Sequence, residues 1–102
     1  MGNYLFVYYG GEMAATPAEQ KKSMDAWMNW FKKQGQAVVD AGNPTMPSKL
    51  VNKSGVKTIT GKKVTGYSIF KANDLDAAVA IAKSSPQMES GEIAIYQIMP
   101  TM

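Results

Sequence analysis

Residues 27–44 read WMNWFKKQGQAVVDAGNP, and this stretch decides the fold. Its first part is the end of an amphipathic helix that stops at Gly35, because glycine commonly closes a helix. A short apolar strand follows over residues 37–40, and Gly42-Asn43-Pro44 is typical of a tight turn. The stretch therefore predicts a helix, a strand and a polar turn in direct succession.

Upstream, the same helix has a complete start signal. Thr16 is a typical N-cap, Pro17 suits the first helical position, and Glu19 completes a capping box. The helix is therefore expected over residues 17–34. One apolar stripe recurs along it at helical spacing and predicts docking on a sheet; its members are Met24, Trp27, Met28 and Phe31. Trp30 falls at the edge of that stripe.

Further strands are predicted on both sides of this stretch. Apolar and aromatic runs predict strands at residues 4–9, 66–71 and 92–99. Residues 48–51 and 56–60 are expected to be edge strands, joined by the turn Asn52-Lys53-Ser54-Gly55. They interrupt the chain between its two strand-helix-strand halves.

A second helix is predicted after Asn73, the expected N-cap, with acidic residues in its first turn. It should end at Ser84-Ser85-Pro86, and its expected buried stripe consists of Leu75, Ala78, Val79 and Ala82. The element order predicts an α+β chain of the ferredoxin-like plan, βαβ-hairpin-βαβ, with two helices on one face of an antiparallel sheet. At 102 residues the chain is expected to be a single domain, 1–102.

The composition excludes several kinds of site. The chain has no cysteine and no histidine, so disulfides, thiolate catalysis, Ser-His pairs and the usual zinc and haem ligands are absent. All 11 basic residues are lysine. Because arginine is the residue that binds phosphate and guanine bidentately, its absence predicts no nucleic-acid partner. No metal or other cofactor is expected.

The chain is expected to be cytoplasmic and to have no membrane partner. No apolar run approaches the ~20 residues that a bilayer-spanning helix needs. The N-terminus begins with a predicted strand and has neither the basic start nor the cleavage site of a signal peptide.

The strand pattern predicts a homodimer. In the first strand, the apolar Leu5 and Val7 alternate with the aromatic Tyr4, Phe6 and Tyr8, so both faces of the sheet are apolar. The helices cover only one face, and a bare apolar face is rarely left in water. The same face of a second copy is the simplest cover, which gives a dimeric α/β barrel. The alternative is a monomer that tolerates the open face.

The chain resembles the YCII-related family, also known through its DGPF-domain branch. The resemblance rests on residues 4–8, 26–31 and 39–44, and on Gly66-Tyr67 followed by residues 75–78. It implies a ferredoxin-like protomer and a dimer with clefts between sheet and helix. A His-Asp pair has been suggested to act in some relatives. Here Asp25 stands near the position of that histidine, and the Asp-Gly-Pro-Phe motif is missing.

Asp40 is the candidate catalytic residue. It follows a buried strand, so partial desolvation would raise its pKa and make it a usable base. The alternative is structural: an aspartate before a turn commonly accepts hydrogen bonds from the backbone of that turn.

Four residues are candidates for ligand binding: Trp30, Asn43, Tyr8 and Tyr67. Asn43 would polarise a carbonyl, Trp30 would form a pocket wall or the dimer seam, and the tyrosines would present hydroxyls to a cleft between protomers. Each has a structural alternative as well, in turn formation or packing.

Three functions follow from these observations. The first is a small homodimer that binds a small, partly apolar molecule in a cleft near Asp40. The second is a cofactor-free oxygenase or isomerase with Asp40 as base, which rests on fold-level analogy. The third is a structural or regulatory dimer without a ligand.

Overall fold

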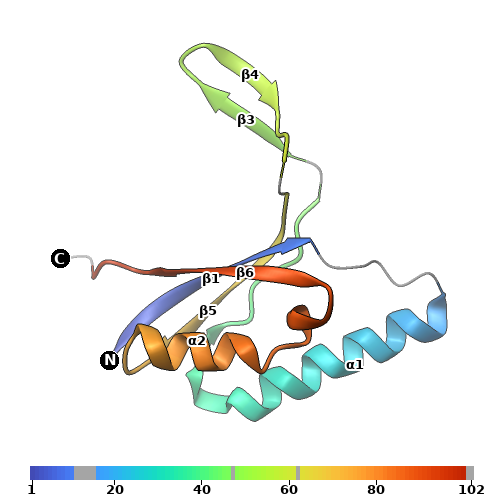
Figure 1. The fold of residues 1–102 in the computed structure, drawn as a ribbon, viewed down its shortest axis with the longest axis vertical. Helices are drawn as coiled ribbons and strands as arrows, with labels where there is room; N and C mark the ends of the chain where they lie inside the picture. The colour runs from blue at the N-terminus through green and yellow to red at the C-terminus, as the bar shows by residue number, and fades with distance from the viewer. Residues whose placement is uncertain (11–15, 47, 62, 101–102) are drawn as a thin grey trace.

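The computed structural model describes residues 1–10, 16–46, 48–61 and 63–100. Within these ranges the chain forms two α-helices and six strands (Figure 1). In chain order the elements are β1 (Gly2–Gly10), α1 (Pro17–Gln34), a 3-10 turn (Gly35–Ala37), β2 (Val38–Asp40), β3 (Lys49–Asn52), β4 (Gly55–Thr58), β5 (Val64–Ala72), α2 (Leu75–Lys83), a second 3-10 turn η2 (Pro86–Glu89) and β6 (Gly91–Gln97).

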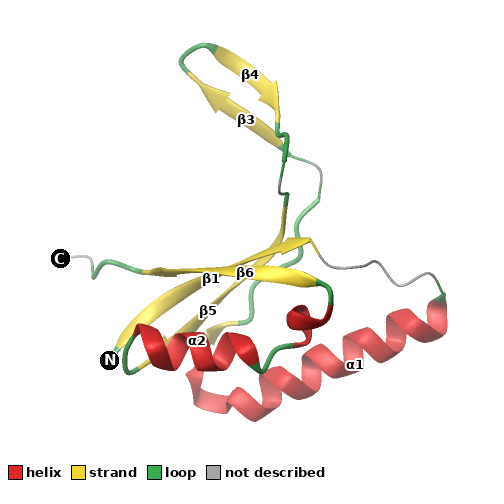
Figure 2. Cartoon of the chain, viewed as in Figure 1, coloured by secondary structure: helices red, strands yellow, loops and turns green. Residues whose placement is uncertain are grey.

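Four strands form one antiparallel sheet in the order β2-β5-β1-β6. The two strands of each strand-helix-strand half are not adjacent: β5 lies between β1 and β2, and β1 lies between β5 and β6. Both helices lie on the same side of this sheet (Figure 2). The α+β, ferredoxin-like plan predicted from the element order is therefore confirmed.

The helix starts follow local capping signals. The Thr16 side chain accepts a hydrogen bond from the Glu19 N–H at 3.2 Å, and α1 begins at the next residue, Pro17, as predicted. The predicted cap of α2 was wrong by one residue. Asp74, not Asn73, is the N-cap, because its carboxylate accepts the Ala77 N–H at 2.8 Å.

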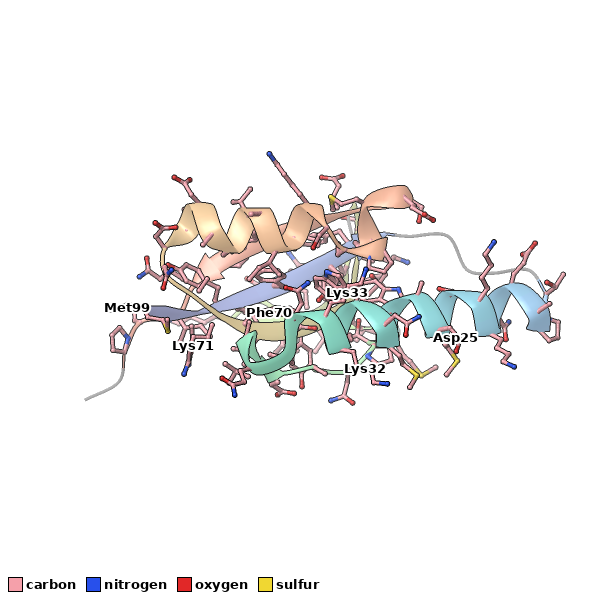
Figure 3. All side chains as sticks on the ribbon, turned by 90° about the horizontal axis from the view of Figure 1, so that it is seen from below. Asp25, Lys32, Lys33, Phe70, Lys71 and Met99 are labelled. Carbon is pink, nitrogen blue, oxygen red and sulfur yellow. The ribbon has the colours of Figure 1, made fainter. Side chains whose placement is uncertain are left out.

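The core lies between the sheet and the two helices. Alternate residues of the central strand β1 point into it: Tyr4, Phe6 and Tyr8 are buried. Phe70 of β5 packs on Phe6 with ring centroids 4.6 Å apart, and Figure 3 shows it between the helices. The remaining buried apolar members are Trp30, Ala72, Ala78 and Ala82.

Part of the predicted helical stripes is exposed. Met24 and Met28 are each 64% exposed, and Leu75 is 49% exposed. Met24 is exposed because α1 reaches past the ends of the strands, so no sheet lies over its N-terminal half (Figure 1). Met28 is in the C-terminal half of α1 and is exposed because it borders an open cleft. Leu75 is the first residue of α2 and lies at the rim of the core. Predicting these three side chains as buried was therefore wrong.

The predicted hairpin exists, but it does not join the main sheet as edge strands. Among the described residues, β3 and β4 pair only with each other, and they stand away from the body on the side of the sheet opposite the helices (Figure 1). The turn is the predicted one: Asn52 Oδ1 accepts the Ser54 N–H at 2.8 Å. We call this hairpin, residues 49–58, the arm.

The second face of the sheet carries apolar side chains that no described helix covers. Val7 lies opposite Tyr67 on β5 and opposite Ala94 on β6, and Leu5 lies opposite Ile69 and Tyr96. We call these six residues the open face. Among the described residues, no helix has the length and hydrophobicity to cross a bilayer.

Candidate functional site

A cleft of about 430 Å³ opens between α1 and the β5 edge of the sheet, on the helix side. The segment after β2 forms its outer wall. The described residues that line it are Tyr8, Ser23, Met24, Trp27, Met28, Phe31, Ala41, Gly42, Asn43, Pro44, Thr65, Gly66, Tyr67, Ser68 and Gln87. None of them carries a charge.

The outer wall is a turn that continues along β5 after β2 ends. The Asp40 carboxylate accepts the Gly42 N–H at 2.8 Å, which closes the turn. Gly42 has a φ of 78°, a left-handed conformation that favours glycine. Beyond it, the Tyr67 N–H donates to the Asn43 carbonyl at 3.3 Å. The wall is thus fixed to β5 by main-chain hydrogen bonds.

A chain of hydrogen bonds ties this wall to the centre of the sheet. The Tyr8 hydroxyl donates to Ser68 Oγ at 2.8 Å, and Ser68 Oγ donates to the Ala41 carbonyl at 2.6 Å. Ser68 is fully buried; its bond with Tyr8 is shielded from water, and its bond with the Ala41 carbonyl is partly buried. The bonds join β1, β5 and the first residue of the wall.

A β-bulge shapes the same end of the sheet. The register between β1 and β5 shifts between Tyr8 and Tyr9, which leaves Thr65 unpaired in the ladder. Its hydroxyl lies within hydrogen-bonding distance of two β1 carbonyls, 3.0 Å from that of Gly10 and 3.3 Å from that of Tyr8. Bulges re-aim side chains next to sites, and this one bends β5 where it lines the cleft.

The inner wall comes from α1 and is aromatic. Trp27 meets Tyr8 edge to face, with centroids 5.2 Å apart, and also contacts Phe31 at 5.9 Å. Gln87 of η2 also lines the cleft. Its side-chain nitrogen donates to the Tyr9 carbonyl at 2.9 Å, so its oxygen is the atom left for a ligand.

Three of the five predicted site residues line the cleft. They are Tyr8, Asn43 and Tyr67, and Asn43 Nδ2 donates to the Tyr67 hydroxyl at 3.3 Å. The other two are elsewhere. Trp30 is only 5% exposed, and its Nε1 donates to Ser84 Oγ at 2.9 Å, which joins the two helices. The structure therefore places Trp30 in the core rather than at a pocket wall.

Asp40 does not line the cleft either. Its side chain is exposed and accepts the hydrogen bond that closes the turn. This geometry supports the structural alternative, in which Asp40 shapes the wall without meeting a substrate.

Sequence reasoning predicted a pocket wall from α1 through Trp30, but it missed Met24, Met28 and Gln87. Met24 and Met28 were interpreted as core filler, although flexible methionines also suit adaptable apolar sites. A signal was available for Met24 alone, which is the N-terminal member of the stripe, where coverage by the sheet was not assured. For Gln87, which contacts the main chain 78 residues away, no local signal exists.

The buried Tyr8 phenol makes stability depend on pH in the alkaline range. Burial raises its pKa to about 12, from an ordinary value of 10.0. The folded state therefore holds this proton more tightly than the unfolded state does. The resulting stabilisation is fully present below about pH 10 and is lost as the pH rises through the folded-state pKa.

The test is to compare denaturant unfolding of the unchanged chain and Tyr8→Phe at about pH 9 and about pH 12. All other side chains are identical in the two chains, so the difference between their losses of stability measures the contribution of Tyr8. We expect the unchanged chain to lose more free energy of unfolding than the variant. Equal losses would contradict a protonated, buried Tyr8.

Comparison with known families places this site in context. The YCII-related domain matches residues 3–102 of the chain, which is nearly its whole length. No curated protein matches it.

Proposed function

This chain belongs to the YCII-related family, and we propose that it is a homodimer that binds a small, uncharged, largely apolar molecule in the cleft between α1 and β5. The chemistry of the cleft lining is the observation that supports a small, uncharged, largely apolar ligand. Its fifteen described lining residues include aromatic rings, two methionine side chains and a few neutral polar groups. A volume of about 430 Å³ falls in the range of ligand sites in proteins, roughly 300–1,000 Å³.

Charge argues for a neutral ligand. A carboxylate or ammonium group entering this cleft would lose water without gaining an opposite charge from the described walls, which is unfavourable by several kcal/mol. The polar groups favour a ligand with one hydrogen-bonding end. The Gln87 side chain supplies an acceptor oxygen, whereas Asn43 Nδ2 is engaged by the hydroxyl of Tyr67, whose side chain belongs to the open face.

The homodimer is supported by the open face. Six apolar or aromatic side chains form a continuous surface over the three adjacent strands β5, β1 and β6. Contiguous apolar surface of this kind usually marks an interface, and a second copy offers an identical, self-complementary face.

Catalysis by Asp40 is not included in the proposal. Its carboxylate is exposed and engaged in the turn, and the described lining residues include no acid. A binding protein accounts for the geometry without a reaction.

The proposal predicts that Met28→Lys prevents binding in the cleft. Met28 lines the cleft at an exposed helix position, so a lysine there leaves the fold intact but introduces a charge into the apolar wall. With the neutral apolar dye Nile red as probe, we expect the dissociation constant to rise by about tenfold or more, which corresponds to about 1.4 kcal/mol.

Met88→Lys is the matched control. Met88 is 42% exposed on η2 and does not line the cleft, so the same substitution should leave dye binding unchanged. Equal effects of the two variants, or none from Met28→Lys, would overturn the assignment of the cleft. Native mass spectrometry of freshly purified protein complements this test, because a retained ligand appears as extra mass on the dimer.

A further inference from the structure

The arm is the most unusual surface of the molecule. Its apolar side chains face solvent: Leu50 is 49% exposed, Val51 70% and Val56 65%. Val51 and Val56 are opposite each other in the hairpin register and form one apolar pair. An isolated two-stranded hairpin is at best marginally stable in water. A hairpin with this surface is expected to rest on another molecule.

Charge is segregated between the arm region and the rest of the chain. Residues 49–63 contain five of the 11 lysines and no acid. The rest of the chain therefore has six lysines against eight acids, a net charge of −2. Three of the five lysines, Lys49, Lys53 and Lys57, lie on the arm itself. The arm is thus complementary in charge to the body of this same protein.

The direction in which the arm extends indicates which molecule it contacts. It rises on the side of the sheet opposite the helices, which is the side of the open face (Figure 1). A second copy docked on the open face lies beside the arm on that side. The arm then has an apolar protein surface within reach, where its valines find partners, and the body that carries this surface has a net negative charge opposite to that of the arm.

We propose that the arm of each copy clasps the body of the other copy in the homodimer. The inference rests on the proposed dimer and adds to it a second interface, formed by residues 49–58. A nucleic acid would satisfy the lysines but not Leu50, Val51 and Val56, and the arm has no arginine for base or phosphate recognition. The apolar pair therefore favours a protein partner.

The first test reverses the charge of the arm with Lys49→Glu, Lys53→Glu and Lys57→Glu together. The matched control reverses three exposed lysines of the helices, Lys22, Lys33 and Lys83, so both variants change the net charge equally. Dimer dissociation constants are measured by sedimentation at low salt. We expect the arm variant to weaken the dimer by about tenfold or more, and the control to leave it nearly unchanged.

The outcomes separate the two proposals. A monomeric unchanged chain overturns the dimer, and the clasp with it. A dimer that is equally strong in the arm variant and the unchanged chain overturns the clasp alone. A labelled DNA duplex that binds the unchanged chain but not the arm variant, while both chains have the same dimer dissociation constant, would show that the arm binds nucleic acid. The proposed contact between copies would then be wrong.

A second test locates the arm directly. Because the chain has no cysteine, Val51→Cys gives a single attachment site for a benzophenone cross-linker. Isotopically light and heavy copies are mixed and irradiated. We expect peptides that join the arm of one copy to the body of the other, seen as light-heavy pairs. Cross-links confined to one copy would overturn the clasp.

Discussion

Gly42→Ala is expected to lower the free energy of unfolding by about 4 kcal/mol or to prevent folding. A Cβ at this position would lie 1.7 Å from the Tyr67 carbonyl oxygen and 2.6 Å from the Tyr67 carbonyl carbon, far inside any contact distance. Both are backbone atoms of a paired strand, so they cannot yield as a flexible side chain does. The turn must move away from β5, and the outer wall of the cleft moves with it.

Gly61→Ala is the control for this substitution. Gly61 has a φ of 81°, close to the 78° of Gly42, but no described atom lies within 4 Å of its added Cβ. It isolates the conformational strain of a left-handed alanine, about 1 kcal/mol. Denaturant unfolding of both variants measures the difference. Similar losses in the two would show that the contact between the wall and β5 is looser than described.

Val7→Glu is expected to convert the proposed dimer to a monomer. Val7 is on the central strand of the sheet, between Tyr67 and Ala94 on the open face. In a monomer the carboxylate would point to water, whereas in the dimer each copy would bury one unpaired charge. At about 2 kcal/mol for each, the two burials raise the dissociation constant by about 1,000-fold.

Ala80→Glu serves as the control, because Ala80 is exposed on α2, outside the open face. It adds the same charge, and its dimer should match that of the unchanged chain. Sedimentation measures assembly, and circular dichroism verifies that Val7→Glu remains folded. A folded Val7→Glu variant that still dimerises with unchanged affinity would rule out the open face as the interface.

Features that depend on neighbours in the chain were predictable from sequence. Thr16-Pro17 sets the start of α1, and Gly35 sets its end, because caps are satisfied within one helical turn. The turn at Asn52 is equally local. Even the error at the start of α2 is local: Asn73 and Asp74 are both good caps, and only the actual hydrogen bond distinguishes them.

Features that depend on distant packing were not predictable. Helical periodicity gives the apolar face of α1 but not how far the sheet extends beneath it. Met28 is therefore exposed in a cleft, while Trp30, expected at the edge of the stripe, is buried against Phe70 with centroids 5.2 Å apart. Likewise, hairpin signals predict β3 and β4 but do not tell whether they join the main sheet.

The candidate site shows the same limit. The sequence singled out Asp40 and Asn43 because they follow a strand, but it did not distinguish a base from a turn-forming carboxylate. Asp40 contacts its own turn and Asn43 contacts Tyr67. The apolar character of the cleft comes instead from α1 side chains such as Met24 and Met28, which the pattern predicts as core, whereas Trp30, the α1 residue predicted at a pocket wall, is buried in the core.

The hydrogen-bond chain from Tyr8 through Ser68 to the Ala41 carbonyl has a consequence for affinity. It fixes the start of the outer wall to a fully buried serine, so the turn cannot swing outward without breaking bonds in the core. The cleft is therefore preorganised, and its competent conformation is the one already populated. A ligand gives up little of its binding energy to order this wall, so even a small molecule with few contacts can be held.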